Sequence, residues 1–353
     1  MRRVLILLLI LVTLVGCAPR VAVDAPSGFA VSFIDVGQAD AILVQDGDAA
    51  VLIDAGNNDD GEIVIDYLLS RGVTRLALAI GTHPDEDHVG GLDTVLAKVP
   101  TDELLIPEKG SDTKTYADVL DMAGRKGVPI TYAAVGQSYA VGGFTLEVLA
   151  PVRVYDDNNN NSVVARVTYG EVVFLLTGDI ESKAERDLVD SGVDLECEVL
   201  KAAHHGSDTS SGYVFLRAAN PKLVVVSCGA GNSYGHPHDA PLSRFRDVGA
   251  TLFRTDTMGT VVLTSDGVTI SANVEGEASD RAHVESGDEN GGGENGLVGD
   301  SAVSVAGYIG NVNSRKFHLP TCGSLPAEKN RVAFDSRGAA VDAGYEPCGV
   351  CKP

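Results

Sequence analysis

Short apolar segments that end in polar turns recur along this 353-residue chain and constrain its fold more than any other feature. A few apolar residues bounded by Gly, Asp or Ser have the length and composition of a β-strand. Helical patterns alternate with these segments, as in Glu62 to Arg71, where apolar residues recur on one face. The alternation runs through residues 29–149 and starts again at Ser162. Two strand-rich halves, each with helices, predict two sheets packed together with helices outside.

The densest polar turn is Thr82-His83-Pro84-Asp85-Glu86-Asp87-His88. It follows an apolar run from Leu76 to Ile80 and places two histidines and three carboxylates within six residues. Imidazole nitrogen and carboxylate oxygen bind divalent metals when a small cluster of them is aimed at one point. This turn therefore predicts a hydrolytic metal centre.

Other predicted strands also end in turns that carry polar side chains. Three strand-end turns, the one at His83 to His88 included, hold six of the chain's eight histidines. Structural histidines placed by chance would rarely be concentrated in this way, so we interpret the turns as parts of one site. The polar residues that follow the other strands are Asp54, Asp179, His204, His205, His236 and His238.

The set of motifs resembles the metallo-β-lactamase superfamily over about residues 29–273. The motifs that carry this resemblance are Val51 to Gly56, His83 to His88, Thr177-Gly178-Asp179 and His204-His205-Gly206-Ser207. Three further motifs narrow it to the soluble hydrolase domain of ComEC-type DNA-uptake proteins: Phe33 to Asp40, Tyr234-Gly235-His236-Pro237 and Arg254-Thr255-Asp256. The resemblance implies an α/β fold, a four-layer αββα sandwich with metals at one edge of the sheets.

The resemblance also implies two divalent metals, zinc or manganese, that activate a water for hydrolysis. Asp87 would in addition accept the proton of that water, and His236 is interpreted as a donor to a substrate phosphate rather than a further ligand. The implied roles are His83 and Asp85 on the first metal, Asp87 and His88 on the second, Asp179 bridging both, His205 as the last ligand of the second, His204 as a donor to the phosphate or leaving group, and Asp54 as a brace behind the ligands.

Two positions depart from the superfamily pattern. Asp85 stands where a second histidine is common, and the usual histidine some twenty residues before the bridging Asp is replaced by Asp156 to Ser162. Asn161 or a neighbour is expected beside the first metal instead. Both changes replace nitrogen with oxygen, which shifts the preference from zinc toward Mn²⁺ or Mg²⁺ and away from β-lactam hydrolysis.

The last segment, residues 303–353, contains His318-x3-Cys322 and Cys348-x2-Cys351. Four such ligands in a short segment indicate a closed structural zinc site, although disulfides with one odd thiol are the alternative. The segment is similar to the zinc-binding module of Ada-type DNA-repair proteins, with His318 in place of one Cys. The resemblance suggests contact with DNA, and a stabilising cap without a partner is the competing interpretation. The basic residues expected at DNA are Arg315, Lys316, Lys329 and Arg331.

The remaining segments predict where the protein is placed. Residues 1–16 resemble a lipoprotein signal peptide, with Cys17 as the lipidated residue of a membrane-anchored tether at 17–28; a plain signal peptide is the alternative. A hydrolase domain at 29–274 is joined by an acidic Gly-rich linker, 275–302, to the zinc-stabilised module. Cys197 and Cys228 are interpreted as buried thiols, with a disulfide possible.

These features predict a lipid-anchored, extracytoplasmic, metal-dependent phosphodiesterase whose substrate is DNA. The net charge of -22 argues against a generally basic nucleic-acid-binding surface but leaves room for a local one. Two alternatives stay open, a phosphodiesterase of envelope polymers such as phosphorylcholine esters and a non-catalytic DNA-binding lipoprotein. No protein partner is indicated.

Overall fold

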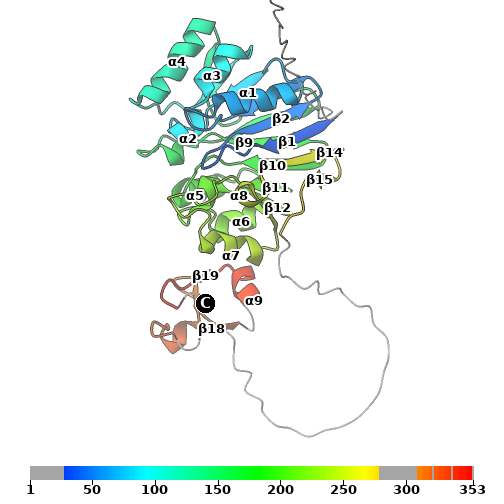
Figure 1. The fold of residues 1–353 in the computed structure, drawn as a ribbon. Coiled ribbons are helices and arrows are strands. Elements are labelled where there is room, and N and C mark those ends of the chain that lie inside the picture. The colour runs from blue at the N-terminus through cyan, green and yellow to red at the C-terminus, as the bar shows by residue number, and fades with distance from the viewer. Residues whose placement is uncertain (1–27, 278–307, 320–321, 335–336, 352–353) are drawn as a thin grey trace, which may run out of the picture.

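The computed structural model describes residues 28–277, 308–319, 322–334 and 337–351. Residues 28–277 form a large domain with two mixed sheets and helices on both outer faces, and residues 308–351 form a small C-terminal module (Figure 1). The predicted four-layer αββα sandwich is confirmed. The predicted signal peptide, Cys17 and most of the predicted linker lie outside the described residues. None of the described helices combines the length and apolar character needed to cross a bilayer.

The first sheet has eight strands in the order β15-β14-β1-β2-β3-β4-β5-β6. Neighbours from β15 to β3 are antiparallel, whereas β3 to β6 run parallel. The strands are β1 (Phe29–Phe33), β2 (Ile42–Asp46), β3 (Ala49–Ile53), β4 (Leu78–Ile80), β5 (Leu104–Ile106), β6 (Ile130–Tyr132), β14 (Val261–Ser265) and β15 (Ile270–Ala272).

The second sheet has seven strands in the order β13-β12-β11-β10-β9-β8-β7. Here β7 to β10 are antiparallel and β10 to β13 are parallel, so the carboxyl ends of β10, β11 and β12 open onto one edge. The strands are β7 (Ser138–Val141), β8 (Phe144–Ala150), β9 (Val164–Tyr169), β10 (Val172–Leu176), β11 (Val199–Lys201), β12 (Leu223–Val226) and β13 (Thr251–Arg254).

The central strands are apolar on both faces because each sheet is covered twice. In β3, Val51 and Ile53 pack in the core between the sheets, where they join Phe174 of β10, while Ala50 and Leu52 pack against helices. Side chains alternate along a strand, so an unbroken apolar run is stable only where both faces are buried.

Helices α1, α3 and α4 cover the outer face of the first sheet, and α5, α6 and α7 cover that of the second (Figure 1). Helix α4 shows how the sequence sets their ends, since Thr113 caps its first turn and Gly127, at φ 68°, ends it in a left-handed conformation. The helices are α1 (Gly61–Ser70), α2 (Glu86–Val89), α3 (Leu92–Lys98), α4 (Lys114–Lys126), α5 (Ser182–Ser191), α6 (Tyr213–Ala219), α7 (Asp239–Asp247) and α8 (Thr255–Met258), with 3₁₀ turns η1 (Asn159–Asn161) and η2 (Ala203–Gly206).

The C-terminal module is a four-stranded sheet, β18-β16-β17-β19, that packs against the large domain through Tyr213 at the start of α6. Arg217 of α6 donates to the carbonyl of Val341, and Arg337 forms an ion pair with Asp247 of α7. Its elements are β16 (Tyr308–Asn311), β17 (Lys316–His318), η3 (Glu328–Asn330), β18 (Arg331–Phe334), α9 (Arg337–Asp342) and β19 (Glu346–Pro347).

The structure differs from the sequence-based expectation mainly at the sheet edges. Strands β6 and β7 were not expected, because edge strands with exposed side chains lack a continuous apolar run. The predicted linker begins slightly too early, since Glu277 pairs with the backbone of Leu252 on β13. Cys197 and Cys228 are buried free thiols.

Candidate metal centre

Asp54, directly after β3, organises the His83–His88 turn from behind. It is fully buried and has a left-handed backbone, with φ 58°. Its carboxylate accepts hydrogen bonds from Thr82 N at 2.8 Å, Thr82 Oγ1 at 2.7 Å and His88 Nδ1 at 2.8 Å. Because a carboxylate only accepts, His88 donates its Nδ1 proton, which leaves the Nε2 lone pair for a ligand. The structure places Asp54 behind the ligands, where the sequence analysis expected it.

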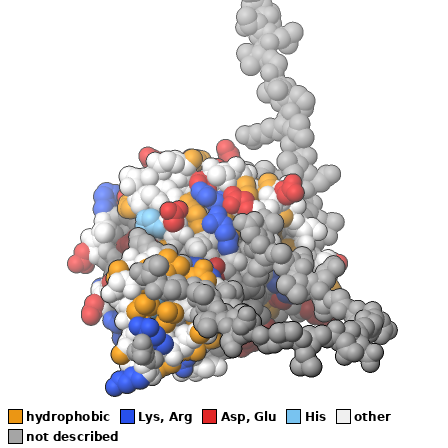
Figure 2. Space-filling model, turned by 90° about the horizontal axis from the view of Figure 1, so that it is seen from below, with side chains coloured by type: hydrophobic (Ala, Val, Ile, Leu, Met, Phe, Trp, Pro, Cys, Tyr) orange, Lys and Arg blue, Asp and Glu red, His pale blue; other side chains and the backbone are white. Residues whose placement is uncertain are grey.

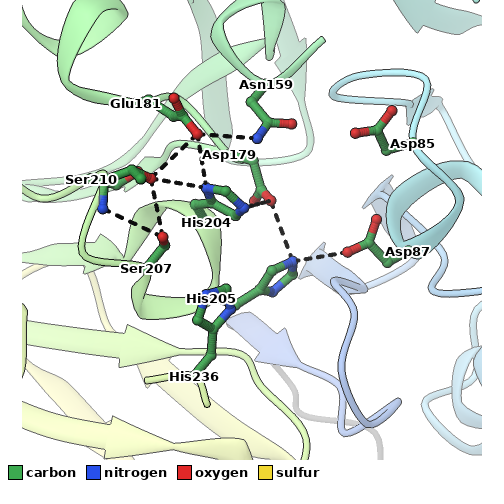
Figure 3. A network of polar contacts seen from close by, with 12 residues as sticks. Asp85, Asp87, Asn159, Asp179, Glu181, His204, His205, Ser207, Ser210 and His236 are labelled. Atoms are coloured by element: carbon green, nitrogen blue, oxygen red, sulfur yellow. Dashed lines mark hydrogen bonds and ion pairs between the residues drawn. The ribbon is translucent and has the colours of Figure 1, made fainter. Parts of the chain in front are cut away.

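His205 is held in the same way from the second sheet. Its Nδ1 lies 3.0 Å from the carbonyl oxygen of Ser227, so Nδ1 carries the proton and Nε2 faces inward. His204 and His205 both have left-handed backbones, with φ 52° and 53°, which non-glycine residues rarely adopt. This turn after β11 directs both rings toward Asp179, and the His205 ring toward Asp87 as well (Figure 3).

Asp179 lies at the centre of the histidines. Its Oδ2 is 3.3 Å from His88 Nε2, 3.4 Å from His205 Nε2 and 3.9 Å from His204 Nε2. The Asp179 backbone N–H donates to Ser162 Oγ at 3.0 Å, which fixes the turn after β10. One carboxylate oxygen surrounded by imidazoles from both sheets has the position required of a bridging ligand.

Asp85 and Asp87 approach from the opposite side, at the start of α2 (Figure 3). Asp87 Oδ2 lies 3.3 Å from His205 Nε2, and Asp85 Oδ2 lies 3.6 Å from His83 Nε2. The side chain of Asp87 remains 32% exposed and that of Asp85 38%, whereas the histidines are buried. These two carboxylates therefore form the open side of the centre.

The residues present fit divalent metals. Two groups of ligand atoms lie within 4.8 Å of one another, His83 with His88 and Asp179, and Asp87 with His88 and His205. The buried Nε2 atoms of His88 and His205 make no hydrogen bond among the described residues, and a bound ion would satisfy both of them. Although burial lowers it, the charge of Asp179 raises the pKa of His205 to about 10, so the centre attracts positive charge.

Asp40 and Lys201 are two buried members that the sequence-based site lacked. Lys201, at the end of β11, is fully buried; its Nζ pairs with Asp40, lies 3.5 Å from Asp179 Oδ1 and donates to the carbonyl of Gly178 at 3.1 Å. Lys201 thus engages Oδ1 of Asp179 and leaves Oδ2 to face the histidines. Two features of the sequence could have indicated these residues. Lys201 is a lone lysine that ends an apolar strand, and Asp40 ends the Phe33–Asp40 motif.

The segment expected beside the first metal, Asn161 or a neighbour, lies next to the first ligand group, and Asn161 itself bonds within its own loop. Its buried amide accepts from Tyr155 N and donates to the carbonyls of Tyr155 and Asp157, so it shapes the loop before β9. Ser162, the next residue, reaches His83 Nδ1 at 3.3 Å, and Asn158 donates to Asp85 at 2.6 Å. The neighbours of Asn161, rather than its own side chain, support the first ligand group.

His236 lies beside the centre, with its ring centroid 6.3 Å from that of His205 and 5.6 Å from that of His204. Gly229 N donates to Gln38 Oε1, which orients Gln38 Nε2 toward His236 Nδ1 at 3.3 Å. Since the amide nitrogen donates, Nδ1 accepts and Nε2 carries the proton. Burial and the neighbouring His205 lower the pKa of His236 to about 4, so its ring is neutral at pH 7. His238 stays at the rim, where its Nδ1 accepts from Asp208 N.

The predicted second metal cluster is assembled in the C-terminal module. His318, Cys322, Cys348 and Cys351 place one ligand atom each within 4.8 Å of the others, and the cysteines are free. Zinc–sulfur bonds of about 2.3 Å in a tetrahedron hold ligand atoms at about this spacing. Ser324 N and Val350 N point at the sulfurs of Cys322 and Cys348, as donors do around thiolates. The donor set fits a closed structural zinc site.

Comparison with known proteins agrees with this geometry. The family model of the metallo-beta-lactamase superfamily matches residues 34–230, and that of the metal binding domain of Ada matches residues 298–353. ComE operon protein 3 of Bacillus subtilis (strain 168) is 31% identical over 252 residues, covering 65% of this chain and 32% of that protein. Competence protein ComA of Neisseria gonorrhoeae is 34% identical over 235 residues, with 65% and 31% covered. Recombination protein 2 of Haemophilus influenzae is 29% identical over 237 residues, with 65% and 28% covered.

This chain therefore spans about a third of the length of the curated relatives that it matches. The matched region contains both ligand groups of the large domain, and the Ada-like match contains the Cys and His cluster. The large domain, with its sandwich fold and its centre at the strand ends, makes this chain a member of the metallo-beta-lactamase superfamily.

Proposed function

We propose that this chain is a metal-dependent phosphodiesterase that cleaves DNA outside the cytoplasm. The observation that carries the proposal is the convergence of ligands from both sheets on Asp179 Oδ2, with Asp85 and Asp87 on an open side. Divalent metals in such a site supply an activated water and neutralise phosphate charge.

Asp87 is the residue best placed to accept the proton of the attacking water. It is partly exposed, and its Oδ2 faces the same ring nitrogen of His205 as Asp179 does. Burial raises the pKa of the Asp87 carboxyl, but His88 and His205 outweigh that effect and hold the pKa well below its usual range. Asp87 is therefore ionised, as a proton acceptor has to be, and its position beside the ligands rather than its basicity supports this role.

His236 and His204 supply hydrogen bonds on the substrate side. The neutral ring of His236 presents Nε2–H, because Gln38 occupies Nδ1. His204 lies beside it, with Nδ1 near Glu181 and Thr209. Two imidazoles next to the ligands can donate to phosphate oxygens as negative charge develops there.

DNA as the substrate is supported by the relatives and by the module. Two of the relatives are named for competence and recombination. The module exposes Arg315, Lys316, Lys329 and Arg331, and Figure 2, which views the molecule from the side of the module, shows basic side chains beside hydrophobic ones. The Ada-like match and the lipobox-like Cys17 support a DNA-contacting, membrane-anchored role.

The direct test is to incubate the full chain, loaded with Mn²⁺ or Zn²⁺, with linear double-stranded DNA, single-stranded DNA, small phosphodiesters and phosphorylcholine-bearing polymers. Cleavage of DNA that is lost in Asp87→Asn supports the proposal. Turnover of small phosphodiesters without any DNA cleavage would contradict it, and turnover of the envelope polymers would favour that substrate instead.

The role of the module is tested separately by its charges. Lys329→Ala and Arg331→Ala should each weaken DNA affinity across sequences and reduce the slope of log affinity against log salt by about one. The matched control is Lys126→Ala, which removes a lysine at the end of helix α4, on the outer face of the first sheet. Equal salt slopes in all four proteins would remove the module from the DNA-binding surface.

A further inference from the structure

A rigid, exposed tyrosine stands at the mouth of the metal centre. Tyr234 is 67% exposed, although it belongs to the loop after β12 that carries His236. Asn232 holds this loop by accepting from Tyr234 N at 3.1 Å and His236 N at 3.0 Å and by donating to Gly229 O at 2.8 Å. The backbone on both sides of the exposed ring is therefore fixed.

The same loop is fastened to the turn that carries the ligand His205. His238 N donates to Gly206 O at 2.9 Å, and His238 Nε2 lies 3.2 Å from the carbonyl of Tyr234. Gly206 has no room for a side chain, since a Cβ there would lie 2.6 Å from Pro237 Cβ. Tyr234 thus has a set position relative to the ligands.

The rings form a stack that leads outward from the centre. His236 is stacked on His205 at 6.3 Å between centroids, and Tyr234 is stacked on His236 at 5.7 Å, with interplanar angles of 24° in both pairs. One face of Tyr234 covers His236, and the large exposed fraction of its side chain leaves the other face to solvent. A planar group on that face would lie next to a phosphate held at His236.

The charge of the protein makes such a platform useful. A formal net charge of -22 gives a polyanionic substrate little general attraction. Stacking of a base on an aromatic ring needs no charge and tolerates any sequence, because every base has a flat face. Paired bases inside a duplex have both faces covered by their neighbours, so only an unpaired base can use the ring.

We propose that Tyr234 is a stacking platform for the base beside the scissile phosphate, which makes single-stranded nucleic acid the preferred substrate class. This inference rests on the proposed phosphodiesterase function and names its substrate. Tyr234 acts in binding, and the ligand groups act on the phosphate.

The experiment compares the metal-loaded full chain with Tyr234→Ala, Tyr234→Phe and Tyr132→Ala, using a single-stranded tetranucleotide. Both KM for cleavage and Kd from fluorescence anisotropy are measured. We expect Tyr234→Ala to raise both about tenfold, with kcat within about twofold, and Tyr234→Phe to resemble wild type. Tyr132, 58% exposed on the edge strand β6, is the matched control and should leave both unchanged.

A second substrate identifies the stacked base. An oligonucleotide with one abasic position beside the cleaved bond should bind wild type and Tyr234→Ala equally, because the group that stacks is gone. The stacking role would be overturned if Tyr234→Ala kept the wild-type KM and Kd, or if Tyr234→Phe lost affinity. Cleavage of DNA by the same proteins would still uphold the proposed function. A wild-type chain that cleaves double-stranded DNA but neither binds nor cleaves the tetranucleotide would overturn the single-strand inference alone, whereas absence of cleavage of any DNA would overturn both.

Discussion

The two ligand clusters of this chain are built in opposite ways. The centre of the large domain collects its ligands from turns after β4, β10 and β11, and buried groups such as Asp54, Lys201 and Ser227 fix each of them from behind. The cluster of the module takes His318, Cys322, Cys348 and Cys351 from one short segment, with three of the four buried. Among the described residues, its supports are backbone N–H groups and Ser324.

The difference follows from the size of the surrounding core. Three apolar clusters hold the large domain, so its ligand geometry is set by packing and can remain open to a substrate on one side. The module has one small cluster, to which Tyr213 of the large domain contributes. We expect a core of that size to depend on a bound metal for folding, whereas the large domain folds on its own core and would use metals for chemistry.

The largest expected effect comes from the closed cluster. Cys348→Ser should remove structural zinc, whose binding contributes about 10 kcal/mol or more to folding in small zinc domains, and should unfold the module. Limited proteolysis and elemental analysis of the full chain measure this. Cys197→Ala, a buried thiol outside the cluster, should keep the zinc count. An intact, protease-resistant module in Cys348→Ser would show that its core suffices.

The next effect concerns chemistry in the open centre. Asp87→Asn should lower kcat for a phosphodiester about 10²–10⁴-fold, because the variant cannot accept the proton of the water. Circular dichroism should show an unchanged fold. Glu86→Gln, an exposed neighbour bonded to Asn58, is the matched control and should retain wild-type kcat. Equal rates in both variants would place the proton acceptor elsewhere.

A buried carboxyl on α5 should also make the stability of the large domain depend on pH. Burial raises the pKa of Glu185 on α5 to about 7, although Gly212 and Ser211 donate to it. A carboxyl whose pKa is raised by folding stabilises the fold when the pH is below its pKa in the unfolded state. That stabilisation is lost as the pH rises through its pKa in the folded state. Between about pH 4.5 and 8, the free energy of unfolding of the wild type should therefore fall by about 3 kcal/mol relative to that of Glu185→Gln.

Denaturant unfolding of both proteins across this range measures the difference. Glu147→Gln, an exposed carboxylate on β8, should show a constant difference from wild type. A difference for Glu185→Gln that does not change with pH would mean that the two backbone donors keep this carboxyl ionised.

The smallest effect tests the brace behind the ligands. Asp54→Asn can still accept from Thr82 but no longer carries the charge that orients His88, so metal affinity of the large domain should fall about 10–100-fold. Competition with a chelating dye reports this affinity, and zinc in the module serves as an internal reference. Asp59→Asn, an exposed neighbour, should bind metals like wild type. Undiminished affinity in Asp54→Asn would mean that packing alone orients His88.

The sequence predicted most strands and helices of the large domain because its strands are apolar on both faces and end at distinctive turns. Strands β6 and β7 could not be predicted in this way, since exposed edge strands carry mixed residues. Among site residues, the ligands lie in polar turns that the sequence identifies, whereas Lys201 and Asp40 are buried charges that pair with each other. The role of a buried charge depends on the partner that it meets in the folded protein, and the spacing of residues in the sequence does not identify that partner.

By itself, the sequence determined the chemistry available to this protein: which turns carry imidazole and carboxylate, which short segment carries thiols, and that both fit divalent metals. Only the tertiary structure decided that Asp179 Oδ2 faces the histidines while Oδ1 faces Lys201, that Ser162 rather than Asn161 reaches His83, and that Tyr234 stacks outward from His236. The physical reason is that ligand type is a property of single residues. Which atom of a ligand is free depends on hydrogen bonds from strands that are distant in the chain and meet only when the two sheets pack.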